Sequence, residues 1–157
     1  MEGLAEKLAN YPVIGLDTTV FIYHLEAHPV FSPLTQEILS GVEQGSWSAV
    51  TSTITLMEIN VHPFKLNRSD IARKYEVLLV NFPNLAIVDI DRDIARRAAQ
   101  LRAEFRIHPA DALQVAAGLV HKVGAFVTND RQLERLRSLI DIIILEDFVP
   151  FSKERGN

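Results

Sequence analysis

Apolar residues along the chain follow two kinds of spacing. Short segments that are almost wholly apolar have the length and composition of buried strands, and they lie at 13–16, 47–50, 85–88, 125–127 and 142–145. The longer segments between them repeat apolar residues every three or four positions, which predicts helices. Parallel strands joined by helices have both faces of their sheet covered, so this alternation predicts an α/β fold with about five mainly parallel strands.

Two helices in the middle of the chain have clear apolar stripes. The first follows possible caps at 51–53, and along its stripe lie Ile54, Met57, Glu58 and Val61. Glu58 therefore shares a stripe with three apolar residues. Pro63 is expected to end this helix, because proline lacks the N–H that the next backbone hydrogen bond needs. The following helix can be capped by Ser69, and its predicted inner stripe is Ile71, Tyr75, Leu78 and Phe82.

The segment from Phe105 to Leu119 predicts a helix start followed by a nearly all-apolar helix. Pro109 fits the first helical position, where its missing N–H costs nothing. Asp111 falls within the first turn, where the helix dipole favours a carboxylate, and almost nothing polar follows before His121. Because this helix has no polar face, Asp111 is expected to lie beside the core.

Composition narrows the class of protein. The chain has 157 residues, of which 48% are hydrophobic and 23% charged, as expected for one globular domain over 1–157 with its core at about 13–148 and a polar tail at 152–157. Apolar runs stay well short of the ~20 residues that span a bilayer, and the N-terminus lacks a signal-peptide core. The absence of cysteine excludes disulfides and thiolate metal sites. We expect a cytoplasmic protein with no membrane segment.

Four acidic residues fall where a parallel sheet would bring them together. Asp17 and Asp130 each follow a predicted strand, and Glu58 lies early in a helix that leaves the same edge. Asp111 starts another helix of the same layered fold. Ligands gather at the carboxyl ends of parallel strands, so these side chains are expected at one site. Each also has a local explanation, since Asp17 and Asp130 can cap helices and Asp111 can complement a helix dipole.

The chemistry of such a cluster favours a cation. Two like charges ~4 Å apart cost roughly 4 kcal/mol at an effective dielectric of 20, so clustered carboxylates hold either protons or a metal ion. An all-oxygen set without a histidine pair suits Mg²⁺ or Mn²⁺, which would activate water for attack on a phosphodiester. Thr18, Thr128 and Asn129 are possible supporting groups around the acids. The arginine-rich face over 91–106, with Lys65, Arg68 and Arg131, is either solvated or tracks an RNA backbone.

Four segments of the chain resemble the signature segments of PIN domains, and VapC-type toxins of toxin–antitoxin pairs in particular. They are L-D-T-T-V-F-I-Y at 16–23, T-S-T-I-T-L-M-E-I at 51–59, H-P-A-D-A-L-Q-V-A-A at 108–117 and V-T-N-D at 127–130. The resemblance implies an α/β/α sandwich and a Mg²⁺- or Mn²⁺-dependent endoribonuclease. It implies that the catalytic, metal-binding quartet is Asp17, Glu58, Asp111 and Asp130, with Thr128 nearby. It also implies an RNA substrate, a cognate antitoxin and a homodimer.

Two alternatives remain from the sequence. A PIN-like domain without turnover would bind RNA or protein only, and its acids would not need to hold a metal. A phosphatase of the haloacid-dehalogenase type also has an aspartate after a strand, as at Asp17. That chemistry needs a second aspartate two residues further on, where this chain has Thr19.

Overall fold

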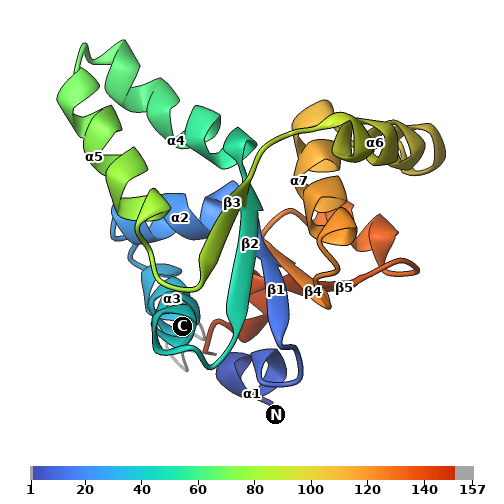
Figure 1. Cartoon of the computed structure of the whole chain (residues 1–157). Coiled ribbons are helices and arrows are strands. Elements are labelled where there is room, and N and C mark those ends of the chain that lie inside the picture. Colours follow the sequence, from blue (N-terminus) through green and yellow to red (C-terminus); the bar gives the residue numbers. More distant parts are fainter. Residues whose placement is uncertain (1, 151–157) are drawn as a thin grey trace, which may run out of the picture.

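The protein is described from a computed structural model over residues 2–150, and its centre is a five-stranded sheet in which all paired strands are parallel (Figure 1). In spatial order the strands are β3 (Leu85–Val88), β2 (Ser48–Ser52), β1 (Val13–Leu16), β4 (Ala125–Thr128) and β5 (Asp141–Ile144). The predicted α/β fold is therefore confirmed. The polar tail predicted at 152–157 lies outside the described residues.

Helices cover both faces of the sheet (Figure 1). They are α1 (Leu4–Leu8), α2 (Thr18–Leu25), α3 (Ser32–Gln44), α4 (Thr53–Lys65), α5 (Ser69–Val80), α6 (Arg92–Phe105), α7 (Pro109–Val120) and the short 3₁₀ helices η1 (Arg131–Leu136) and η2 (Leu145–Phe148). Among residues 2–150, no helix has the length and apolar character to cross a membrane.

Two apolar cores lie on opposite faces of the sheet. Helices α1, α2 and α3 pack into one core, whereas α6, α7 and η1 pack into the other. Strand β5 shows the alternation, because Ile143 belongs to the first core while Ile142 and Ile144 belong to the second. A strand whose side chains pack into a core on each face of the sheet is apolar along its whole length, which is why the strands are continuous apolar runs in the sequence.

The order of the strands creates one preferred place for a ligand. The chain builds β1, β2 and β3 outward in one direction and then adds β4 and β5 on the other side of β1. The topological switch point therefore lies between β1 and β4, and their carboxyl ends open into the crevice where α/β folds bind ligands. Asp17 follows β1 directly, and Thr128 is the last residue of β4.

The predicted end of α4 at Pro63 is wrong. The helix continues through Pro63 to Lys65, and the proline ring is buried. Its position in the last turn limits the cost, because Pro63 removes only one backbone hydrogen bond near the helix end. Beyond it, the N–H of Arg68 donates to the Pro63 carbonyl at 2.8 Å and closes the chain reversal into α5.

The predicted inner stripe of α4 is wrong in register, and that of α5 is correct only in part. In α4 the buried residues are Thr55, Ile59 and Pro63, while Met57 and Val61 are 55% and 47% exposed. In α5 the predicted Tyr75 and Phe82 pack against the first core, but Ala72 and Leu79 are buried in place of the predicted Ile71 and Leu78. Ser52 sets the phase of α4, because its Oγ caps the helix by accepting the N–H of Ile54 at 3.1 Å. Both helices have a second, outer apolar stripe that periodicity alone cannot distinguish from the core side.

Candidate active site

Asp17 lies at the centre of the sheet edge and is 6% exposed. Its Oδ1 accepts the N–H of Thr18 at 2.9 Å, and its Oδ2 accepts the hydroxyl of Thr128 at 2.7 Å. Asp17 is thus the N-cap of α2, as its local explanation predicts. Capping uses one lone pair of Oδ1, so both oxygens keep capacity for a further partner.

Glu58 reaches the same edge from the second turn of α4 and is partly buried. Its Oε1 accepts the hydroxyl of Thr18 at 2.7 Å. Thr18 therefore touches two of the predicted acids, with its N–H on Asp17 and its hydroxyl on Glu58. The first residue of α2 joins the acid at the end of β1 to the acid on α4.

The other two predicted acids come from α7 and from the segment that follows β4. Asp111 is partly buried in the first turn of α7. Asp130 caps η1, because its Oδ1 accepts the N–H of Gln132 at 2.9 Å. The N–H of Asp130 donates to the hydroxyl oxygen of Thr128 at 3.1 Å, so Thr128 bridges Asp130 and Asp17 as the predicted supporting hydroxyl.

Electrostatics link the four carboxylates. Burial raises the pKa of Asp17 to about 6, against hydrogen bonds from Thr128 and Thr18 and with added repulsion from Asp111 and Glu58. Burial also raises the pKa of Asp111, with further repulsion from Asp130 and Glu58 and a smaller opposing effect of His108. Within residues 2–150, none of these four carboxylates is ion-paired with lysine or arginine. The negative charge of the site is therefore not balanced by those side chains.

The chemical type of the donor atoms at this site fits a hard divalent cation. Four carboxylates without thiolate or paired imidazole suit Mg²⁺ or Mn²⁺. Their arrangement is open, since the part of the chain that the structure describes contains no group of three His, Asp or Glu side chains set to enclose an ion. Like charges oppose closer approach, so drawing these carboxylates around one centre requires a counter-charge between them.

Asn129 and Arg131 form their hydrogen bonds and ion pairs with residues other than the four acids. Asn129 Nδ2 donates to the Tyr23 hydroxyl at 3.2 Å, and its Oδ1 accepts the N–H of Glu146 at 3.0 Å, which braces the loop after β4. Arg131 forms ion pairs with Asp147 at 2.7 Å and Glu134 at 3.0 Å. These contacts give Asn129 and Arg131 structural roles around the site.

The sequence analysis overlooked a buried polar residue beneath the acids. Gln114 lies one turn after Asp111 on α7 and is 3% exposed. It forms hydrogen bonds with Ser52, Thr55 and Thr18, which come from β2, α4 and α2. A single amide in an otherwise apolar helix is the signal that could have revealed it, since a buried amide requires polar partners.

Comparison with known protein families assigns the chain to one family. Residues 14–139 match the PIN domain family. The chain belongs to the PIN domain family. This confirms the predicted family, covers all four acids and leaves the phosphatase alternative without support. A comparison with curated proteins gives no match.

Solved structures with the fold of this PIN domain include chains of toxin–antitoxin complexes. A toxin–antitoxin complex from Klebsiella pneumoniae matches with a TM-score of 0.62 and 20% identity, over 85% of this chain and 97% of that one. VapBC2 from Rickettsia felis bound to a promoter DNA fragment matches with a TM-score of 0.65 and 18% identity, over 83% of this chain and 96% of that one. DNA-bound VapBC from Salmonella typhimurium matches with a TM-score of 0.64 and 24% identity, over 85% of this chain and 97% of that one. At these identities the likeness concerns the fold.

The metal-free PIN domain is expected to lose stability as pH rises from about 4 to about 6. Below this window Asp17 is protonated in both states; above it, ionisation is opposed only in the folded state, because the folded pKa is raised to about 6. The penalty is about 3 kcal/mol by linkage. Urea unfolding in the presence of chelator should show that the free energy of unfolding of Asp17→Asn increases relative to that of the wild type as pH rises through this window.

Asp91→Asn is the matched control for this experiment. Asp91 caps α6 through the N–H of Ile94 at 2.9 Å and is exposed, so its variant tests the loss of a capping carboxylate's charge at an exposed position, where Asn can still accept the N–H. Parallel stability curves for Asp17→Asn and wild type between pH 4 and pH 7 would contradict the buried-charge account.

Proposed function

We propose that this PIN domain is a metal-dependent endoribonuclease and the toxin of a toxin–antitoxin pair. The observation that carries the proposal is the meeting of four carboxylates from four chain segments at one sheet edge, where burial and repulsion from neighbouring acids raise the pKa of Asp17 and of Asp111. Membership of the PIN domain family and a fold shared with chains of toxin–antitoxin complexes support it. A cytoplasmic location and a single domain over the whole chain are parts of this proposal.

In this proposal Asp17, Glu58 and Asp111 hold Mg²⁺ or Mn²⁺, and Asp130 completes the site directly or through water. The bound cation would neutralise charge that develops on the phosphate and lower the pKa of the attacking water. The carboxylates alone would repel an RNA backbone, so the cation also makes phosphate binding possible.

The chain's own contribution is to fix the direction of each carboxylate. The N–H of Thr18 and the hydroxyl of Thr128 hold the two oxygens of Asp17 in place. Asp111 sits on α7, whose residues from Val115 to Gly118 are buried and fix the position of the helix. Rigid carriers matter because Mg²⁺ demands near-ideal ligand geometry.

The competing proposal is a PIN-like module that binds RNA or protein without turnover. It predicts no need for a cation at the acids, whereas the present proposal requires one. Titration calorimetry with Mn²⁺ separates the two, because an absence of Mn²⁺ binding by the wild type would favour the binding module.

RNA cleavage by the purified protein is expected with Mg²⁺ or Mn²⁺ and should stop with chelator. Asp17→Asn and Asp111→Asn should each reduce the rate roughly a hundredfold or more, since loss of several kcal/mol of transition-state stabilisation has this effect. Asp91→Asn should cleave at the wild-type rate, because Asp91 caps α6 and is separate from the quartet. Equal cleavage by wild type and both quartet variants would refute a role for the acids.

Metal-free Asp111→Asn is expected to be at least as stable as wild type, because repulsion from Asp130 and Glu58 is removed. Mg²⁺ should then raise the melting temperature of wild type only. At a Mg²⁺ concentration a hundred times its Kd, the gain in the free energy of unfolding is about 2.7 kcal/mol. The control is Asp93→Asn, which removes an exposed carboxylate from the first turn of α6. A lower melting temperature for metal-free Asp111→Asn would indicate that Asp111 serves the helix dipole instead.

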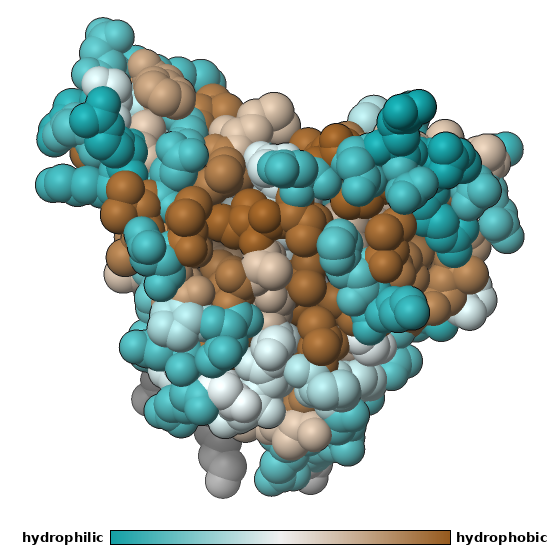
Figure 2. Space-filling view, in the orientation of Figure 1, coloured by the Kyte–Doolittle hydropathy of each residue, from teal (hydrophilic) through white to brown (hydrophobic). Residues whose placement is uncertain are grey.

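The proposed antitoxin has a suitable apolar surface on this chain. Helices α4 and α5 extend from the sheet as a pair, and Figure 2 shows brown, hydrophobic residues along them. Between 47% and 60% of each of these side chains is exposed: Met57, Val61, Phe64, Leu66, Val77, Leu78 and Val80. Monomeric proteins rarely expose so many large apolar residues on one element pair, which favours a partner here.

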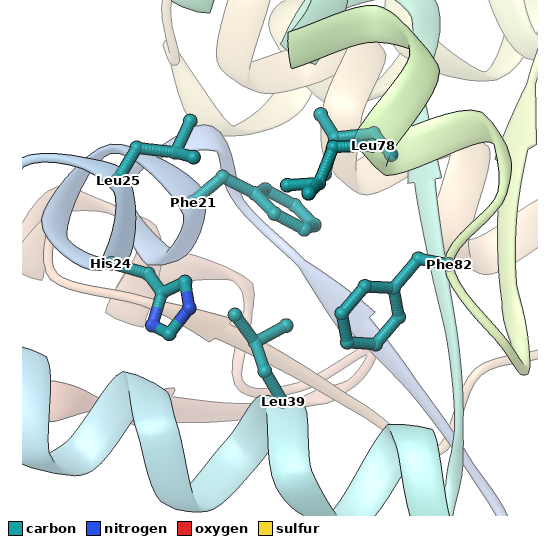
Figure 3. A pocket seen from close by; sticks show the side chains of 7 residues that line it. Phe21, His24, Leu25, Leu39, Leu78 and Phe82 are labelled. Carbon is teal, nitrogen blue, oxygen red and sulfur yellow. The ribbon is translucent and has the colours of Figure 1, made fainter. Parts of the chain in front are cut away.

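A small apolar pocket adjoins this surface. It has a volume of about 110 Å³ and lies between α2, α3 and α5 (Figure 3). Its lining residues are Phe21, His24, Leu25, Leu39, Leu78, Leu79 and Phe82. Leu78 belongs both to the pocket lining and to the exposed apolar surface, so an apolar side chain of the partner can be anchored where the two meet.

Leu78→Glu is expected to weaken binding of the proposed cognate antitoxin at least tenfold, because the complex would bury an unpaired charge. Leu139→Glu is the matched control, since Leu139 is also exposed but lies between η1 and β5. Co-purification and titration of the two chains measure the effect. Unchanged binding by Leu78→Glu would contradict this placement, and loss of a wild-type homodimer in that variant would assign the surface to self-association.

A further inference from the structure

We propose that Gln114 is a positioning residue for Glu58 and that it acts through the hydroxyl of Thr18. The inference rests on the proposed function, in which Glu58 helps to hold the cation. It assigns a purpose to the buried amide of α7 and to the hydroxyls around it, and it concerns a residue that touches none of the four acids itself.

The side chain of Gln114 uses all of its main hydrogen-bonding directions. Its Nε2 donates to Thr18 Oγ1 at 3.0 Å and to Thr55 Oγ1 at 2.8 Å. Its Oε1 accepts the hydroxyl of Ser52 at 2.6 Å. A primary amide has two hydrogens on nitrogen, so both are committed to the two threonines.

The hydrogen of Thr55 is committed as well. The hydroxyl of Thr51 donates to the carbonyl of Leu16 at 2.9 Å, which uses its only hydrogen. In the 2.7 Å contact between the hydroxyls of Thr51 and Thr55, the hydrogen must therefore come from Thr55. Thr55 can then only accept from Gln114 and from other donors.

The hydrogen of Thr18 is left for Glu58. Thr18 Oγ1 accepts from Gln114 and has two acceptors within reach, Glu58 Oε1 at 2.7 Å and the Thr55 hydroxyl at 3.1 Å. Its hydrogen goes to Glu58, because the carboxylate is both closer and the stronger acceptor. With the amide reversed, the carbonyl oxygen of Gln114 would face Thr18 and compete for this hydrogen. The anchor at Ser52, whose hydroxyl donates to Oε1, keeps the amide in the orientation that directs Thr18 toward Glu58.

This chain of directed hydrogen bonds joins the elements that carry the acids. Gln114 and Asp111 are three residues apart and lie on the same face of α7. Helix α7 thus places one carboxylate itself and, through Thr18, fixes Oε1 of a second. Thr18 binds only Oε1 of Glu58, which leaves Oε2 available for the cation of the proposed site.

The experiment measures Mn²⁺ affinity of the full chain by electron paramagnetic resonance of free Mn²⁺. Gln114→Met keeps the length of the side chain without its donors, and Thr18→Val keeps the N–H on Asp17 without the hydroxyl. Each is expected to weaken Mn²⁺ binding about tenfold or more, as is typical when a group that orients a metal ligand is lost. The double variant should bind no more weakly than the weaker single one, because both changes break the same route.

Two controls separate positioning from general stability. Thr18→Ser restores the hydroxyl and should restore the affinity. Thr35→Val removes a fully buried hydroxyl that donates to the Ser32 carbonyl at 3.1 Å on α3, so it should lower the melting temperature without changing Mn²⁺ affinity. If Gln114→Met does not fold, the comparison of Thr18→Val with Thr18→Ser still decides whether the hydroxyl matters.

Each outcome bears on the inference. Wild-type affinity in Gln114→Met or in Thr18→Val overturns it while leaving the proposed function intact. Additive losses in the double variant overturn the route through Thr18. A wild-type protein that binds no Mn²⁺ overturns the proposed function first and this inference with it. A tenfold loss in both single variants, recovery in Thr18→Ser and no further loss in the double variant support it.

Discussion

The free-energy cost of burying a carboxylate away from water is the constraint on which the site of this protein depends. Asp17 lies at the centre of the sheet edge, where burial opposes its ionisation more strongly than two hydrogen bonds favour it. Repulsion from Asp111 and Glu58 raises the pKa of Asp17 further, and none of the four acids pairs with lysine or arginine within residues 2–150. The cation of the proposed function would relieve this repulsion, because a positive charge between the acids favours their ionised forms.

The topology of the sheet makes that cluster possible. Strand β1 is central, and chain segments leave its neighbours β2 and β4 at the same edge, so acids distant in sequence arrive within interaction range. Two buried cores hold the edge rigid from both sides. Beside the acids, the Gln114 amide forms hydrogen bonds with the hydroxyls of Ser52, Thr18 and Thr55, so the buried polar groups around the site are satisfied by one another.

How much the sequence predicts depends on whether a residue's role is local. The five strands and several helix starts were predictable because apolar runs and caps are local features, although Ser69, the predicted cap of α5, is its first helical residue and Arg68 is the N-cap. The meeting of the four acids at one sheet edge followed from the same local features, while their role stays a prediction. The inner faces of α4 and α5 were not, because both sides of these helices are apolar and Ser52 sets the phase. Gln114 was missed for a related reason, since its partners Ser52 and Thr18 are 62 and 96 residues away in sequence.

Helix α4 connects the two halves of the proposed function. Glu58 faces the acidic edge, whereas Met57 and Val61, one residue before and three after it, are exposed on the apolar surface. A partner that packs on that surface contacts the same two helical turns that carry Glu58. Val61 is three residues from Glu58 and so lies beside it on the helix surface. In the proposed function, an antitoxin bound to this apolar stripe would therefore lie next to the acid that helps to hold the cation.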